Sequence, residues 1–538
     1  MKRFILQRVA PQRLLSLLLF GVVVFGSNIG FAQSSTDLSY LLTAPERSSF
    51  EETTRYDEVM AFLRVASAQS PMLHLTTFGY TTKGRAMPLV VFGDVADATV
   101  ESVRASGKMP IFVQGNIHAG EVCGKEALLM LIRDLAEGRH RNWADSLVIL
   151  MAPIYNADGN ERVNLFNRPR QNGPLAGMGQ RPNAQGLDLN RDHMKVKSPE
   201  ARSLLQVFNT YDPKVVVDLH TTNGTRHAYH VTYSPPLNPN TAPPIDTYLR
   251  KTWLPEMTET IRERVGWEYY YYGNLPYRRG DPGWYTFDNR PRFNNNYVGL
   301  RNRMAILSEA YSYATFEERI MATLYFVEEI LNHAADQRTA IEQVIATAEA
   351  IPLAGMDLGV RFQPSMNQES VEILMGDVET LRNPYSGSSY YERKDTVYTQ
   401  TMPEWGAFEP TETARAPAHY VVSASAASVV GAYLDTHGVI YSSISEADER
   451  ELEAFTIDST TVSSREFQQI FERTLFGSSS SKWVAVEEGS LIVSTSQPLG
   501  RLVFYLLEPR SDDGLVNWAQ LDKWLEPGKD YPIYRSID

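Results

Sequence analysis

The sequence contains almost no cysteine, and this limits how the protein can be stabilised. Cys123 is the only cysteine among 538 residues, so no disulfide can form within the chain. A chain without disulfides depends on a buried apolar core, and 43% hydrophobic residues are enough to build one. We expect Cys123 itself to be a small buried residue. Its position far from the N-terminus also excludes a lipid-modified cysteine at an export-signal cleavage site.

Long apolar runs are scarce too, and the one that is present lies near the N-terminus. Residues 14–26 (LLSLLLFGVVVFG) follow a basic segment and precede Gly30-Phe31-Ala32, which has small residues where a signal peptidase cuts. The run is too short to span a bilayer comfortably. We therefore predict that residues 1–32 are a signal peptide and that the protein is exported, to the periplasm or the cell exterior. An uncleaved N-terminal anchor is the alternative.

Positive charge is in deficit. The formal net charge is −13 at pH 7, and it becomes more negative once the four basic residues of the signal are removed. Such a charge repels nucleic acid and anionic membrane surfaces. We expect neither as a partner.

Apolar strands alternate with helical segments through the first part of the chain. Continuous apolar runs of this length are typical of strands covered on both faces, and they occur at residues 109–114, 147–154, 215–219 and 304–307. Helical patterns lie before, between and after them, at residues 56–68, 122–135 and 315–350 and after Ser198-Pro199. The alternation predicts an α/β fold with a mostly parallel or mixed central sheet and helices on both faces.

The pattern changes after about residue 350. Short β-rich segments separated by Ser, Thr, Gly and Pro follow, among them residues 418–422, 482–486, 490–495 and 501–506. An α/β part is expected around residues 424–434. We predict a first, catalytic domain at residues 33–350 and a smaller, mainly β accessory domain at residues 351–538, which is long enough for a core of its own.

Residues that can bind a metal ion follow three of the predicted strands. His118 and Glu121 lie where the strand 109–114 passes into a helix, His220 follows the strand 215–219, and Glu309 follows the strand 304–307. Side chains at the carboxyl ends of parallel strands meet at one edge of a sheet. Two imidazoles and one carboxylate are a standard ligand set for a catalytic zinc ion. We predict one Zn²⁺ per chain, bound by His118, Glu121 and His220; a structural polar pair at a helix start is the alternative for the first two.

Other polar residues near these strands are weaker candidates. His227 and His230 point to opposite faces if their segment is extended, so a shared metal ion is not favoured. Asp218 alternates onto the same face as His220, and we expect it to form a buried hydrogen bond. Cys123 is not favoured as a ligand.

These residues, in this order, resemble the zinc carboxypeptidase family of the carboxypeptidase A type. The resemblance runs from about Tyr56 to about Ile330. The matching places are the His-x-x-Glu pair at His118 and Glu121, the Asn-x-Asp-Gly turn at residues 156–159, the segment at residues 186–191 that ends in Asn190-Arg191, His220, and Glu309. The shorter members of the family lack an extension like residues 351–538, so the resemblance implies no role for it.

The resemblance implies a role for each of these positions. Glu309 would be the general base, a role that suits a carboxylate beside metal-bound water. Asn190 and Arg191 would hold the C-terminal carboxylate of a peptide, which the planar fork of an arginine fits. An arginine before Asn190 would polarise the scissile carbonyl; we favour Arg170 over Arg168.

The family also uses a mobile tyrosine upstream of the catalytic glutamate. Tyr285 and Tyr297 are the candidates for this substrate-binding role, although neither aligns closely and a structural role is the alternative for each. The tyrosine run at residues 269–272 predicts an edge strand or loop rather than a site.

Together these features predict an exported metallocarboxypeptidase. It would hydrolyse the C-terminal peptide bond of peptides that have a free carboxylate, using a zinc-activated water with Glu309 as general base. The alternative is a related zinc amidohydrolase, such as a deacylase or an enzyme that cuts the peptide stems of cell-wall polymer. A non-catalytic binding protein is a third possibility, and the intact ligand set and Glu309 argue against it.

Overall fold

The computed structural model describes residues 37–169, 171–222, 224–276 and 282–536. The predicted signal peptide at residues 1–32 and the predicted catalytic Arg170 lie outside the described residues. Within the described ranges, no helix is both long and apolar enough to cross a membrane.

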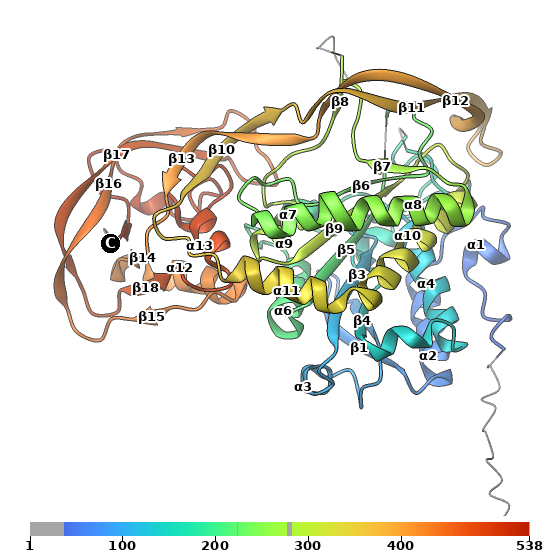
Figure 1. Ribbon diagram of the computed structural model, residues 1–538, viewed down its shortest axis with the longest axis horizontal. Coiled ribbons are helices and arrows are strands. Elements are labelled where there is room, and N and C mark those ends of the chain that lie inside the picture. The colour runs from blue at the N-terminus through green and yellow to red at the C-terminus, as the bar shows by residue number, and fades with distance from the viewer. Residues whose placement is uncertain (1–36, 170, 223, 277–281, 537–538) are drawn as a thin grey trace, which may run out of the picture. The chain divides into compact units, whose positions relative to one another are not determined.

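A mixed sheet of eight strands forms the centre of the first part of the chain (Figure 1). Strands β4, β3, β5 and β9 run parallel to one another, and β2 and β6 continue the sheet antiparallel on either side. The predicted α/β fold is confirmed. The spatial order is β1 (Leu73–Tyr80), β2 (Ala86–Phe92), β4 (Leu147–Ala152), β3 (Met109–Gly115), β5 (Val215–Thr221), β9 (Met304–Ala310), β6 (Val231–Ser234) and β7 (Tyr269–Tyr271).

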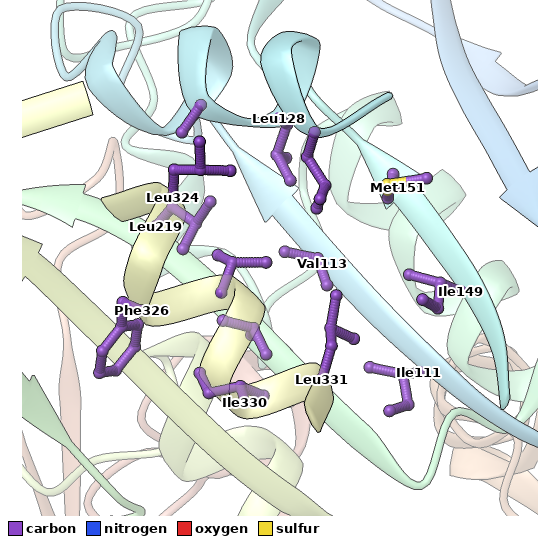
Figure 2. Packing of buried hydrophobic residues seen from close by; sticks show 14 of the residues in the cluster. Ile111, Val113, Leu128, Ile149, Met151, Leu219, Leu324, Phe326, Ile330 and Leu331 are labelled. Carbon is purple, nitrogen blue, oxygen red and sulfur yellow. The ribbon is translucent and has the colours of Figure 1, made fainter. Parts of the chain in front are cut away.

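Helices cover both faces of this sheet because the central strands are apolar on both sides. Alternate side chains of β3 enter different cores: Ile111 and Val113 pack on one face, and Phe112 packs on the other. Figure 2 shows Leu128 and Leu331 packed near Ile111 and Val113 on the first face. This face is covered by α2 (Tyr56–Gln69), α4 (Cys123–Ala136) and α10 (Phe316–Asp336).

The opposite face is covered by α6 (Pro199–Tyr211). Its start is fixed by Ser198, whose side chain accepts a hydrogen bond from the backbone N–H of Ala201, and by Pro199 in the first turn. The remaining helices of this part are α1 (Ala44–Arg47), α3 (Val100–Ala105), α5 (Ala157–Asn160), α7 (Pro243–Tyr248), α8 (Leu254–Val265), α9 (Asn294–Leu300) and α11 (Arg338–Glu349).

The C-terminal region is mainly β, as predicted. A six-stranded sheet has the order β15 (Ser442–Ser443), β18 (Leu491–Ser494), β14 (His419–Val422), β19 (Ile533–Arg535), β16 (Asp448–Val462) and β17 (Arg473–Val486). The segment expected to be an α/β part is the single helix α12 (Ala424–His437). The β-rich reading of residues 501–506 was wrong, because they form α13 (Gly500–Leu507). Its residues are all buried, and a short apolar run without periodicity does not separate a strand from a buried helix.

The C-terminal region and the first part of the chain share one apolar core. Leu204 and Phe208 of α6 belong to the same cluster of buried side chains as Leu434 of α12 and Leu502 of α13. We retain a boundary near residue 350 as a proposal, because the sheets on its two sides differ in type.

A long hairpin connects the C-terminal region with the loops of the central sheet. It consists of β11 (Gln368–Arg382) and β12 (Ser389–Trp405), and β12 pairs in parallel with the short β8 (Trp284–Tyr285). The strands before and after the hairpin, β10 (Asp357–Ser365) and β13 (Ala407–Arg415), also pair with each other. The hairpin also contacts the segment after His220, because Met375 forms an isolated bridge with His227. The hairpin thus joins two segments that are distant from it in sequence, β8 and the segment of His227.

Candidate metal centre

The candidate metal ligands are positioned by three neighbouring parallel strands. His118 and Glu121 lie in the turn between β3 and α4, and His220 lies near the end of β5. Glu309 on β9 is the register partner of His220. Gly124 in the first turn of α4 allows the close approach of this helix to β5, because an added Cβ would lie 2.6 Å from Cβ of Leu219.

Three ligand atoms from these residues converge. Nδ1 of His118 and Nδ1 of His220 lie 3.1 Å and 2.9 Å from Oε2 of Glu121, and the two ring nitrogens lie 3.2 Å apart. All three side chains are buried, at 1–3% exposure. The predicted metal ligands are therefore together, and their donor set of two imidazole nitrogens and one carboxylate oxygen fits zinc.

Two further carboxylates orient the imidazoles. Nε2 of His118 lies 3.0 Å from Oδ1 of Asp188, and Nε2 of His220 lies 2.9 Å from Oδ2 of Asp218. Each Nε2–H can donate to its carboxylate, which leaves Nδ1 as the metal-binding atom. The hydrogen bond expected of Asp218 is present, whereas Asp188 was missed, because its partner is 70 residues away in sequence.

The charges around the ligands are strongly coupled. Burial opposes the charged form of Glu121, but His118 and Arg168 together hold its pKa well below the usual value. Burial would likewise lower the pKa of His220, but Asp218 and Glu121 raise it well above the usual value. A metal cation bound to Nδ1 would compete with a proton for the same atom.

A cavity of about 140 Å³ opens beside the ligands. It contains two of the predicted substrate-binding residues, Asn190 and Arg191, and the predicted base Glu309. Its other lining residues are His118, Glu121, Arg181, His220, Thr221, Thr222, Tyr272, Phe287, Phe293 and Leu307.

Arg191 and Asn190 are held by the wall of this cavity. The guanidinium carbon of Arg191 lies 3.6 Å from the ring centroid of Phe293, and its Nη1 donates to the carbonyl of Asn190. Burial lowers the pKa of Arg191 to about 10, so it is still cationic at neutral pH. Oδ1 of Asn190 accepts the backbone N–H of Asn294 at 2.8 Å. Both residues are therefore fixed and face the cavity.

The arginine nearest to the ligands inside the cavity is Arg181, which the sequence analysis missed. Its Nε donates to Oδ2 of Asp188 at 2.7 Å, and its Nη1 lies 3.7 Å from Oε1 of Glu121. Arg168 also contacts Oε1 of Glu121, at 2.5 Å, but it does not line this cavity. Arg181 lies in the same interval before Asn190 as Arg168 and Arg170, so its position was the available signal.

The structure does not bring the two candidate tyrosines to the cavity. Tyr285 stacks on Trp405 with ring centroids 5.5 Å apart, and Tyr297 is fully buried with its hydroxyl 2.8 Å from Nδ1 of His437. Tyr272, at the end of β7, does line it. The edge strand or loop expected at residues 269–272 is the edge strand β7 followed by Tyr272, and the expectation that this run is not a site stays a prediction.

The weaker candidates for metal ligands, His227, His230 and Cys123, are not part of the group formed by His118, Glu121 and His220. The ring of His227 packs 4.2 Å from that of Tyr311, and the ring of His230 stacks 4.5 Å from that of Trp267. Cys123 is buried, with its Sγ 3.0 Å from Oγ1 of Thr221. Among the residues that the structure describes, only His118, Glu121 and His220 form a metal-binding group.

Taken together, the parallel strand ends, the two-histidine, one-glutamate centre and the adjacent carboxylate of Glu309 define the class of metal-dependent hydrolases. The sequence pattern of the zinc carboxypeptidase family matches residues 59–288. This match covers less than half of the chain, and together with the curated relatives it supports assignment as a metallocarboxypeptidase. Such enzymes act on peptides.

Comparisons with individual proteins agree with this assignment. Carboxypeptidase 2 of Trichophyton rubrum is 24% identical over 512 residues, which cover 90% of this chain and 86% of that protein. The carboxypeptidase N catalytic chain of Rattus norvegicus is 34% identical over 145 residues, 26% of this chain and 30% of that protein.

Solved structures similar to this chain include two carboxypeptidases. Carboxypeptidase A from Helicoverpa armigera has 15% identity and a TM-score of 0.40, covering 56% of this chain and 75% of that one. A metallo-carboxypeptidase from Burkholderia cenocepacia has 16% identity and a TM-score of 0.38, covering 52% and 69%.

Proposed function

We propose that this metallocarboxypeptidase removes the C-terminal residue of peptides that have a free carboxylate, with one zinc ion held by His118, Glu121 and His220. The observation that supports this most is the shared cavity. Glu309, which can move a proton, and Arg191, which can hold a carboxylate, line the same small space as the three ligands. The zinc ion, when bound, lowers the pKa of a water molecule to about 7 and polarises a carbonyl group.

Glu309 would be the general base. Burial raises its pKa to about 8, and its buried Oε2 has no hydrogen-bond partner among the described residues. A cation at the ligands would lower this pKa and favour the carboxylate. The unpaired oxygen can accept the proton of the attacking water and then pass it to the leaving amine.

Two arginines would bind the substrate, one at the carbonyl of the scissile bond and one at the C-terminal carboxylate. Arg181, beside Glu121, would donate to the carbonyl oxygen as it gains negative charge, in place of the predicted Arg170. Arg191 would pair with the C-terminal carboxylate by two hydrogen bonds, with Asn190 beside it. A requirement for this carboxylate is what would make the enzyme an exopeptidase.

We also propose that the protein is exported, on the basis of the signal-like segment at residues 1–32. The basic and apolar stretches of that segment support export but do not distinguish the periplasm from the cell exterior.

A matched pair of peptides tests the exopeptidase activity. The zinc-loaded protein is incubated with a peptide and with its C-terminally amidated form, and products are identified by mass spectrometry, with and without a chelator. We expect stepwise loss of C-terminal residues from the free peptide alone, and none with chelator. Equal cleavage of both forms would contradict the carboxylate role of Arg191, and internal cleavage would contradict exopeptidase action.

A further inference from the structure

A second cavity adjoins the one beside the metal ligands. Tyr272 lines both cavities, and Thr286 on the wall of the second is the chain neighbour of Phe287 on the wall of the first. The second cavity has a volume of about 190 Å³. Sites for drug-sized ligands measure roughly 300–1,000 Å³, so this space suits a single side chain.

The C-terminal region supplies one wall of this second cavity. Asn367, Gln368, Glu404 and Gly406 line it, and all lie beyond the segment that matches the family. Glu404 is fixed in place because it pairs with Trp284 across β12 and β8. Its Oε2 accepts hydrogen bonds from Nδ2 of Asn367 at 2.6 Å and Nε2 of Gln368 at 3.0 Å.

Glu404 is a buried carboxylate, and the two amides that donate hydrogen bonds to it are neutral. Its side chain is 2% exposed, and within the described residues no cationic side chain forms an ion pair with it. Burying a charge is costly unless an opposite charge accompanies it. A cationic group that entered the cavity would complete the pair.

Two cationic side chains also line this cavity, but each has a weaker electrostatic effect there than Glu404. Nε of Arg250 is bound to Oδ1 of Asp246 at 2.7 Å, so its charge is largely neutralised. Lys251 is exposed, so water and salt screen its charge. The field inside the cavity is therefore dominated by the buried Glu404.

We propose that the second cavity binds the side chain of the substrate's C-terminal residue and that Glu404 selects a basic one, lysine or arginine. This inference rests on the proposed function, in which Arg191 holds the carboxylate of the same residue in the first cavity. A long basic side chain would lay its methylene groups along Tyr272 and Leu237 and bring its charge to Glu404. The C-terminal region thereby contributes directly to substrate selection.

Peptides that differ only in their last residue test the proposal. The zinc-loaded full chain is assayed with peptides ending in lysine, leucine or glutamate, and kcat and KM are measured for each. We expect lysine to be preferred, and Glu404→Gln to lower kcat/KM for the lysine peptide by at least about 30-fold, mainly through KM. Turnover of the leucine peptide should stay within about two-fold. Glu409→Gln, on the neighbouring strand and outside the cavity, is the matched control and should behave as wild type.

A second variant covers the case in which Glu404→Gln does not fold. Lys251→Glu lies at the exposed rim and should raise the preference for lysine over leucine by about 2–5-fold. An unchanged lysine-to-leucine ratio in both variants, or in Lys251→Glu when Glu404→Gln is unfolded, overturns the role of Glu404. Failure to cleave any of the three peptides, with zinc bound, would instead contradict the proposed function.

Discussion

His220 and Glu309 are register partners on the adjacent parallel strands β5 and β9. The sheet thus holds a metal ligand and a carboxylate side by side at one edge, with no loop between them. A geometry set by strand pairing is more rigid than one set by loops, and this favours a fixed distance between a proton acceptor and the metal.

Glu309→Gln should keep the fold and the metal but lose most activity. The amide cannot accept a proton from water at neutral pH, and loss of a general base typically costs about 10²–10⁴-fold in rate. The measurement is kcat on a peptide substrate, together with zinc content by elemental analysis. Near-normal turnover with zinc present would remove Glu309 from the reaction.

Arg181 and Arg168 should have separable roles. Arg181→Ala should lower kcat by about 10²–10³-fold, as loss of one donor to a developing oxyanion does, with little change in zinc affinity. Arg168→Ala removes a cation that contacts Glu121 outside the cavity and should mainly alter zinc affinity. Steady-state kinetics and a chelator competition on both variants check this, and the opposite pattern would exchange their roles.

Asp218→Asn should weaken zinc binding. The carboxylate accepts from Nε2 of His220, and loss of such a partner typically lowers metal affinity by about 10–100-fold. Competition with a chromogenic chelator measures the change. Asp94→Asn, at an exposed position far from the ligands in sequence, is the matched control. If both variants retain wild-type affinity, Asp218 does not support the ligand.

His227 should make stability depend on pH. Burial lowers its pKa to about 3, from an ordinary value of 6.5, so the folded state resists a proton that the unfolded state accepts. Its stabilising contribution is present above pH 6.5 and is lost as the pH falls below it, by roughly 1.4 kcal/mol per pH unit. His227→Phe should therefore lose less stability between pH 7 and pH 5 than wild type does. Urea unfolding at both pH values measures this, and parallel losses would contradict it.

Much of the fold and the metal centre follows from local sequence signals. The apolar runs of β3, β4, β5 and β9 are long enough to identify from the sequence. The pairing of parallel strands brings their carboxyl ends together and does not depend on the conformation of the loops. His118 and Glu121 are three residues apart, so their proximity is local. His220 joins them because β5 lies beside β3.

The residues that were missed depend on contacts that no local pattern encodes. Arg181 is recognised only by its distances to Asp188 and Glu121, since four arginines lie in the same interval. Tyr272 reaches the cavity because β7 ends there at the sheet edge. Helix α13 was predicted to be a strand because a completely buried segment lacks the pattern of polar and apolar residues that distinguishes a helix from a strand.

The cluster that includes Phe208 of α6 and Trp518 of the C-terminal region has a practical consequence for dissecting this protein. A fragment that stops near residue 350 would expose to water the apolar side chains of α6 that pack against the C-terminal region, and such surfaces drive aggregation. Proteolysis or truncation should therefore inactivate the enzyme by loss of solubility, even though every metal ligand lies within the retained part.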